Sequence, residues 1–324
     1  MKDVVLDTDD RFRLTDIDQP APGPGEVAIA VQYAGIQWGD VLVRGGHFPV
    51  PRPFVPGFEA AGRVIAVGEG VDVELLDRPV TALTGGGAYA EVVLAPAALV
   101  FDATGVDPRT AAGLGWAAPT AYDLINTVAR VRAGDSVLIH AAAGGVGSLA
   151  AQFARQAGAE RIVGVVGNAD RAAYATRFGY DLLLSREDFR DATADERFDV
   201  ILDPVGGPTR LTNVQRLAPH GRLALYGNIA TPDSVALDDN DLLVSGASVL
   251  TYNGNLLSRT HPHRLADSAR AALRMVASGQ VRPDITATYE MVDLDEAVHR
   301  LAEGGTRGKS VLRITGGSSR TFRG

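Results

Sequence analysis

The stretch Ser136-Val-Leu-Ile-His-Ala-Ala-Ala-Gly-Gly-Val-Gly-Ser148 decides the fold of the second half of the chain. Its apolar run, Val137 to Ile139, predicts a buried parallel strand that ends in a turn of small residues. Apolar residues at helical spacing follow, and a second apolar run, Arg161 to Val166, lies about 20 residues further on. This order is typical of a βαβ unit that binds a dinucleotide.

The small residues of the turn have a physical role in this interpretation. Glycine lets backbone N–H groups approach a pyrophosphate closely, and the start of the following helix supplies partial positive charge. Ala142 stands where the first glycine of the usual pattern would be. A purely structural strand-to-helix turn is the alternative, and the flanking strands disfavour it. The residues of this turn that we expect to bind the cofactor are Ala142, Gly144, Gly145, Val146 and Gly147.

Composition limits the function classes. The 324 residues suffice for two domains, and the net charge of −8 argues against a nucleic-acid-binding protein. No apolar run reaches the roughly 18 residues of a membrane span, and the acidic N-terminus lacks a signal-peptide pattern. The chain has no cysteine, which excludes disulfides, thiolate metal sites and a cysteine nucleophile. We therefore expect a cytoplasmic protein that binds neither nucleic acid nor membrane.

The chain has two kinds of sequence pattern. Up to about residue 115, short strands such as Gly62–Gly68 alternate with Gly and Pro, which indicates a compact antiparallel or barrel-like domain. From about residue 119, strands alternate with amphipathic helices, as in a doubly wound parallel sheet. Asp203 ends a predicted central strand of that sheet, at the edge where ligands bind. The tail, residues 315–324, is expected to be mobile.

Motifs along the whole chain point to one family. Together with the glycine turn, they are Gly35-Ile-Gln-Trp-Gly-Asp40, Pro56-Gly-Phe-Glu-Ala-Ala-Gly-Arg-Val64, Gly85-Gly-Gly-Ala-Tyr-Ala-Glu91, Thr120-Ala-Tyr122, Asp203-Pro-Val-Gly206, Gly227-Asn228 and Gly308-Lys309. The chain resembles the medium-chain dehydrogenase/reductase superfamily, in its zinc-independent quinone oxidoreductase-like branch. The resemblance implies an α/β protein. Its GroES-like β-barrel domain would comprise residues 1–118 and 254–324, and its doubly wound Rossmann domain residues 119–253. It also implies a homodimer that pairs through an edge strand at residues 244–251.

The resemblance bears on zinc as well. Zinc-dependent relatives carry Cys and His where this chain has Gln37 and Phe58. Glu59 remains, but one carboxylate does not make a zinc site. We therefore expect no catalytic zinc.

The end of the second Rossmann strand predicts which dinucleotide binds. An NAD enzyme usually places Asp or Glu there, whereas this chain has Gly167. Arg171 stands where the family often carries a basic ligand of the 2′-phosphate, and Ser185 or Arg186 replaces a family tyrosine. The pattern favours NADPH, although Asp170, either a helix cap or a ligand of a 2′-hydroxyl, keeps NAD as an alternative. The residues expected to bind at this end are Asn168, Arg171 and Ser185.

The resemblance assigns further residues to the cofactor. They are Thr120, Gly227, Asn228 and Lys309. Helix capping is the alternative for Thr120, and a solvated surface position is the alternative for Lys309. His140, which ends the first Rossmann strand, is expected to be a packing residue.

The substrate side follows from the same chemistry. Without zinc to polarise a carbonyl, hydride transfer from a nicotinamide suits an activated double bond, whose enolate needs hydrogen-bond donors and then a proton. Asp40 is expected to be structural. The candidate catalytic residues are Gln37, Tyr252 and His47, and the candidate substrate-binding residues are Trp38 and Phe48. Core packing is the alternative for the aromatic residues, and a solvated loop position for His47.

The expected function is therefore an NADPH-dependent, zinc-independent reductase of a quinone, an enone or another activated double bond. One alternative is a tailoring reductase that acts on enoyl thioesters or polyketide-like intermediates. The other is a non-catalytic NADPH-binding protein. In each catalytic case the partner is a small molecule.

Overall fold

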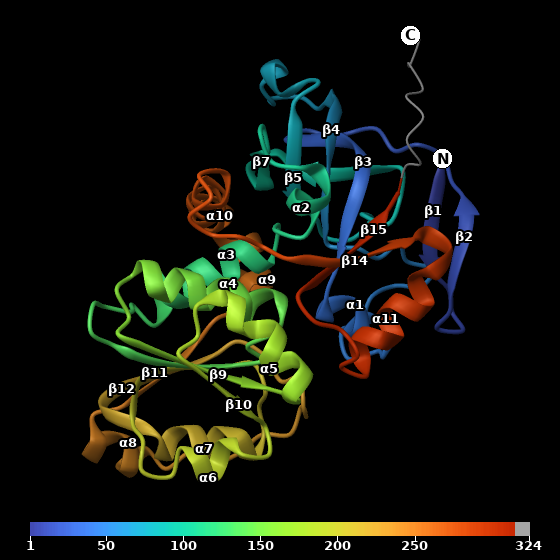
Figure 1. The fold of residues 1–324 in the computed structure, drawn as a ribbon. Helices are drawn as coiled ribbons and strands as arrows, with labels where there is room; N and C mark the ends of the chain where they lie inside the picture. The colour runs from blue at the N-terminus through green and yellow to red at the C-terminus, as the bar shows by residue number, and fades with distance from the viewer. Residues whose placement is uncertain (315–324) are drawn as a thin grey trace. The chain divides into compact units, whose positions relative to one another are not determined.

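The computed structural model describes residues 1–314, which form two compact units (Figure 1). The first unit comprises Met1–Trp116, His261–Ala277 and the described residues from Pro283 on, and the second comprises Ala117–Thr260 and Ser278–Arg282. The sequence interpretation places residues 254–260 in the barrel domain, whereas here they pack with the second unit. They do so as a helix that follows the last strand of its sheet. The tail that we expect to be mobile, residues 315–324, lies outside the described residues.

The second unit is built on a parallel sheet. Its strands are β8 (Ser136–His140), β9 (Arg161–Val166), β10 (Leu182–Ser185), β11 (Phe198–Asp203), β12 (Leu217–Leu225) and β13 (Ser248–Thr251). Among the described residues, they lie in the order β10-β9-β8-β11-β12-β13, and all neighbours are parallel. The chain builds outward from β8 to β10 and then restarts at β11 on the other side of β8. This reversal is the topological switch point of a doubly wound fold, as expected.

Helices cover both faces of this sheet, with α4 and α5 on one face and α7 and α8 on the other (Figure 1). They are α3 (Ala117–Asp123), α4 (Gly145–Gln156), α5 (Ala169–Ala175), α6 (Phe189–Ala192), α7 (Pro208–Gln215), α8 (Asp239–Ser245) and α9 (Gly254–Thr260), with short helical turns at Leu124–Val128 and Thr176–Phe178. Leu138, Phe198 and Ile201 are fully buried between the layers. No helix within residues 1–314 is long and apolar enough to cross a membrane.

The predicted edge strand at residues 244–251 is only partly correct. Ser248–Thr251 forms β13 at the edge of the sheet, but Val244 belongs to α8. The Asp238 side chain accepts the N–H groups of Asn240 and Asp241 and so starts this helix, and Gly246, with φ of 65°, ends it. Val244 is 89% exposed. The homodimer stays a prediction.

The first unit contains the barrel-like sheet, mostly antiparallel. Its strands are β3 (Glu26–Ile36), β4 (Glu59–Val67), β5 (Pro79–Leu83), β6 (Val92–Pro96), β7 (Val100–Asp102), β14 (Ile285–Glu290) and β15 (Lys309–Arg313). In the described part of the chain, their order is β14-β15-β3-β4-β5-β7, and β6 also pairs with β3. Because β14 and β15 come from the last part of the chain, both ends of the sequence build this unit, as the resemblance implies.

Smaller elements complete the first unit. They are the hairpin β1 (Lys2–Leu6) and β2 (Phe12–Asp16), the helices α1 (Trp38–Arg44), α2 (Pro108–Ala112), α10 (Pro262–Ala277) and α11 (Leu294–Ala302), and helical turns at Val73–Leu75, Ala97–Leu99 and Met291–Asp293. Before β6 begins at Val92, Ala90 makes an isolated bridge to Asp3.

A buried carboxylate fixes the start of α1. Asp40 is fully buried, and its Oδ2 accepts the Gln37 N–H at 2.9 Å and the Tyr89 hydroxyl at 2.7 Å. Burial raises the pKa of Asp40 to about 6, although these hydrogen bonds oppose the shift. The carboxyl group therefore holds the backbone of Gln37 in place from the core of the barrel.

The Asp40→Asn substitution tests this raised pKa. A group with a raised folded-state pKa adds stability that is fully present below its unfolded value of 3.8 and is lost as the pH rises through about 6. Between pH 7 and pH 5, the free energy of unfolding of the wild type should therefore rise by about 1 kcal/mol relative to Asp40→Asn. Urea unfolding of both proteins at both pH values measures this difference in the free energy of unfolding. The exposed Glu69→Gln change serves as control, and a pH-independent difference for Asp40→Asn would contradict the assignment.

Candidate functional site

The turn between β8 and α4 brings the predicted glycine motif together. Ala141 has the left-handed φ of 53°, which is uncommon for a residue with a side chain. The Gly144 N–H donates to the Ala141 carbonyl at 2.9 Å, and α4 begins at Gly145. The N–H groups of the first helical turn, from Gly145 to Gly147, have no acceptor within the helix. They are thus available to an anion at the helix start.

Close packing fixes the shape of this turn. A Cβ atom on Gly147 would lie 2.5 Å from the Ala141 carbonyl oxygen, so no side chain fits there. The Tyr180 hydroxyl lies 3.1 Å from the carbonyl oxygen of Ala142 and 2.8 Å from that of Gly147, so its single proton is shared between the two ends of the turn. Sequence reasoning missed Tyr180, since only the fold brings it to the turn. The turn therefore leaves no room for a side chain at Gly147, which is the feature expected of a pyrophosphate-binding turn.

Two arginines converge where β9 ends. A Cβ atom on Gly167 would lie 3.2 Å from Nη1 of Arg171 and 3.8 Å from Nη2 of Arg186. Burial and, next, the charge of Arg186 lower the pKa of Arg171. The place that would hold the acidic residue of an NAD site thus has two neighbouring guanidinium groups. Arg186 was only an alternative to Ser185 in the sequence, and the structure brings it to Gly167.

The other residues predicted at this end have local structural partners. The Asn168 side-chain oxygen accepts the Arg171 N–H at 3.0 Å and caps α5. Asp170 is exposed in the first turn of α5, so it is not the cap. The Ser185 hydroxyl donates to the Asp188 carboxylate at 2.6 Å and accepts the Asp188 N–H. The positive charge at this end therefore comes from the two arginines.

Gly227 and Asn228 come after β12, separated from it by Tyr226, and lie beside the turn after β11. The N–H of Ile229 donates to the Pro204 carbonyl at 2.9 Å, which joins the two turns. Asp203 is fully buried, and its Oδ1 accepts the N–H groups of Val205 and Gly206. The Asp203 carboxylate, which we expect at the ligand-binding edge of the sheet, thus points into the protein interior.

His140 is a packing residue, as expected. It is 2% exposed, its Nε2 lies 2.8 Å from Oδ1 of Asn213, and its ring meets that of Phe189 edge to face. Burial lowers the pKa of His140, and the Asp203 carboxylate opposes this shift only in part. A neutral ring that donates from Nε2 to the Asn213 oxygen fits this geometry.

Thr120 and Tyr252 lie near one another at the carboxyl end of the edge strand β13. Tyr252 follows β13, and its N–H donates to the Leu225 carbonyl at 2.9 Å. Burial raises the pKa of Tyr252, and the neighbouring Asp123 carboxylate adds to the shift, so the phenol stays protonated. Thr120 lies inside α3, which begins at Ala117, so the capping alternative for it is wrong.

The candidate substrate residues of the barrel unit surround α1. Gln37 precedes the helix and Trp38, half-buried, is its first residue. His47 and Phe48 follow the helix in an exposed turn, where the Phe48 N–H donates to the Leu42 carbonyl at 3.0 Å. Phe48 is 38% exposed, so core packing is not its main role.

Lys309 is not a solvated surface lysine. Its ammonium pairs with the fully buried Glu59 carboxylate, and the Lys309 side chain is only 11% exposed. The second Glu59 oxygen accepts the Trp116 N–H at 2.8 Å. Both carboxylate oxygens of Glu59 therefore have partners inside the barrel. If Lys309 also contacts a cofactor, its positive charge acts on the cofactor and on Glu59 together.

The residues at the family's zinc position do not suit a metal. Phe58 has no donor atom and packs near Phe54, the ring centres being 6.3 Å apart. Gln37 offers only an amide, and Glu59 is already paired with Lys309. Within residues 1–314, no group of three or more His, Asp or Glu side chains could hold a metal ion.

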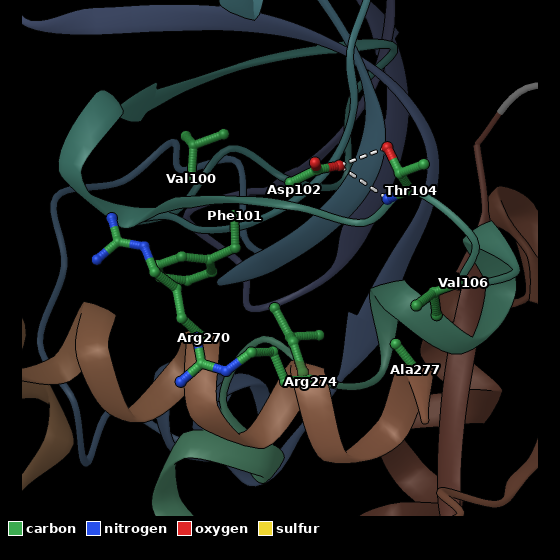
Figure 2. Close-up of a pocket in the computed structure, with 9 residues that line it drawn as sticks. Val100, Phe101, Asp102, Thr104, Val106, Arg270, Arg274 and Ala277 are labelled. Atoms are coloured by element: carbon green, nitrogen blue, oxygen red, sulfur yellow. Dashed lines mark hydrogen bonds between the residues drawn. The ribbon is translucent and has the colours of Figure 1, made fainter. Parts of the chain in front are cut away.

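A separate pocket of about 330 Å³ lies between β7 and α10 (Figure 2). The Asp102 carboxylate at its rim accepts the N–H and the hydroxyl of Thr104, and the Arg270 guanidinium carbon lies 5.9 Å from the ring centre of Phe101. The pocket is lined by Val100, Phe101, Asp102, Thr104, Val106, Arg270, Leu273, Arg274 and Ala277. None of the predicted cofactor, catalytic or substrate residues is among them.

Known families match most of both units. Residues 23–105 match the alcohol dehydrogenase GroES-like domain, and residues 145–274 match the zinc-binding dehydrogenase family. A 2-haloacrylate reductase of a Burkholderia species is 30% identical over 94% of this chain and 95% of its own length. The phthioceranic/hydroxyphthioceranic acid synthase of Mycobacterium tuberculosis is also 30% identical, over 90% of this chain. This chain spans only 14% of the length of that synthase.

Solved structures are similar over nearly all of the chain. A quinone oxidoreductase of Pseudomonas syringae has a TM-score of 0.87 at 30% identity, covering 96% of this chain and 99% of that one. A mycobacterial protein in complex with NADPH has a TM-score of 0.88 at 28% identity, covering 97% and 99%. On the evidence of both domains and of these full-length similarities, the chain belongs to the medium-chain dehydrogenase/reductase superfamily of oxidoreductases, in its quinone oxidoreductase-like branch.

Proposed function

We propose that this protein is an NADPH-dependent reductase that acts without zinc and transfers a hydride to a quinone, an enone or another activated double bond. The main support for NADPH is the pair of guanidinium groups of Arg171 and Arg186 beside Gly167. Guanidinium groups suit a 2′-phosphate, and an acidic residue that would suit a free 2′-hydroxyl is missing from that position. The similar mycobacterial structure in complex with NADPH supports this choice.

The donor set around Glu59 supports the zinc-free part of the proposal. Phe58 supplies no ligand, and Glu59 is engaged by Lys309 and the Trp116 N–H. A carbonyl substrate would therefore lack a Lewis acid. Conjugated substrates need less help, because the negative charge that develops on oxygen can be held by hydrogen-bond donors alone.

In the proposed reaction, bound NADPH supplies the hydride. The side-chain amide of Gln37 donates a hydrogen bond to the substrate oxygen, and Asp40 holds the backbone of Gln37 at the start of α1. Tyr252, whose phenol stays neutral, acts as a second donor, and His47 in its exposed turn delivers the proton. Trp38 and Phe48 contact the apolar part of the substrate.

A second candidate is a tailoring reductase for enoyl thioesters or polyketide-like intermediates. The similarity of 90% of this chain to a segment of a mycobacterial acid synthase favours it. The two candidates share the cofactor and the hydride transfer and differ in what the substrate side must recognise. A panel of substrates separates them.

The two arginines provide the first test. Arg171→Ala and Arg186→Ala should each raise the Kd of NADPH about tenfold, because each removes a charge-assisted hydrogen bond to the 2′-phosphate. The Kd of NADH should change less than about twofold, because NADH lacks that phosphate. Fluorescence titration of the nicotinamide measures both constants.

Arg177→Ala is the matched control, since the Arg177 guanidinium stacks on the Tyr174 ring with 4.8 Å to its centre. It should leave the preference for NADPH unchanged. An equal loss of NADH and NADPH affinity in Arg171→Ala and Arg186→Ala would contradict the 2′-phosphate assignment.

Turnover tests the reaction itself. NADPH oxidation should be seen with at least one of 1,4-benzoquinone, a simple enone and an enoyl thioester, before and after dialysis against a metal chelator. A preference for the thioester would favour the tailoring candidate. Loss of activity on chelation, restored by Zn²⁺, would refute the zinc-free proposal. Tight NADPH binding without turnover of any substrate would support the non-catalytic alternative instead.

A further inference from the structure

Arg210 of α7 connects the ends of two neighbouring strands. Its Nη2 donates to the Gly227 carbonyl at 2.7 Å and to Oδ1 of Asn228 at 2.5 Å, both after β12. Its Nε lies 3.5 Å from Oδ2 of Asp203, the last residue of β11. The Arg210 side chain is 14% exposed and that of Asp203 is fully buried. The contact with Asp203 is an ion pair without a hydrogen bond, so the two acceptors after β12 fix the position of the guanidinium group and the buried carboxylate balances its charge.

Asp203 anchors this arginine from the core. While Oδ2 faces Arg210, Oδ1 accepts the Val205 N–H at 2.6 Å and the Gly206 N–H at 3.1 Å. The carboxylate thus belongs at once to the turn after β11 and to the ion pair. Removing either charged partner would leave the other with its hydrogen bonds but without an opposite charge beside it.

Arg210 also decides which way the Asn228 amide faces. Because Oδ1 of Asn228 accepts from Arg210, the amide NH₂ group is the part of this side chain left to donate. A Cβ atom on Gly206 would lie 3.1 Å from that same oxygen, so the amide is packed closely against the turn after β11. Asn228 itself is exposed at the carboxyl ends of the strands.

We propose that Arg210, held by Asp203, is a positioning residue that presents the Asn228 amide as a hydrogen-bond donor to the nicotinamide half of the cofactor. This inference rests on the proposed NADPH function. In a doubly wound sheet, each half serves one nucleotide. Gly167 and Arg171, after β9, belong to the half proposed to hold the 2′-phosphate, whereas Asn228, after β12, belongs to the other. Arg210 should thus act on one half of the dinucleotide only.

The test compares two ligands, NADPH and 2′,5′-ADP, which carries the adenosine half and the 2′-phosphate but no nicotinamide. Arg210→Met should raise the Kd of NADPH about tenfold, because the amide loses its orientation, and leave the Kd of 2′,5′-ADP within about twofold of wild type. Arg210→Lys, which can still donate to one oxygen, should recover part of the NADPH affinity. In an Asn228→Ala background, Arg210→Met should have little further effect, since it acts through Asn228.

The chain supplies a matched control in Arg222 and Asp135. The Arg222 guanidinium donates to the Asp135 carboxylate at 2.7 Å and to the carbonyls of Ala129 and Arg130 at 2.8 Å, and its side chain is 16% exposed. This cluster lies at the amino ends of the strands, because Asp135 precedes β8. Arg222→Met should lower the thermal midpoint much as Arg210→Met does, yet leave the Kd of both ligands unchanged.

The outcomes separate the two levels of the proposal. If Arg210→Met weakens both ligands equally, or neither, the positioning role is wrong. If the wild type binds neither ligand, the proposed function fails and this inference falls with it. If Arg210→Met fails to fold, the same two Kd values are compared in Arg210→Lys and Asp203→Asn. Both variants should lose affinity for NADPH and keep the wild-type affinity for 2′,5′-ADP.

Discussion

The close approach of α4 to β8 and β9 is the constraint on which the nucleotide-binding unit depends. Gly147 has no room for a Cβ atom beside the Ala141 carbonyl, and Gly164 has none beside Ala142, since its Cβ atom would lie 2.8 Å from that of Ala142. Tyr180 ties the turn from the outside. Because of this packing, the first N–H groups of α4 are available to an anion at the start of the helix. Charged side chains can then lie at the carboxyl ends of the neighbouring strands.

Charged groups in both units act mainly through position. Arg171 and Arg186 concentrate positive charge at one end of the parallel sheet, while Arg210 and Asp203 hold the turns at the ends of β11 and β12. In the barrel unit, Asp40 holds the start of α1. Asp40 and Asp203 are fully buried and Arg210 nearly so, and in such low-dielectric surroundings they orient backbone and amide groups more effectively than exposed residues would.

Local patterns predicted much of this from the sequence. The alternation of strands and helices predicted the parallel sheet, the glycine spacing predicted the turn before α4, and motifs along the chain identified the family. What could not be predicted depends on contacts between distant residues. The pairing of Lys309 with Glu59 could not be predicted, and its role toward the cofactor stays a prediction. Val244, expected in a strand, lies in a helix that is capped by Asp238. Tyr180 and Arg210 have no local signal, because their partners are brought to them only by the fold.

The central claim is that this protein uses the nucleotide-binding turn to place a hydride donor against an activated double bond. Reduction of a simple enone with NADPH deuterated at the transferring position of carbon 4 tests it most directly. Mass spectrometry and NMR of the product should show one deuterium at the β-carbon and a solvent-derived proton at the α-carbon. A product without deuterium, formed while the labelled NADPH is consumed, would contradict direct hydride transfer and with it the proposed function.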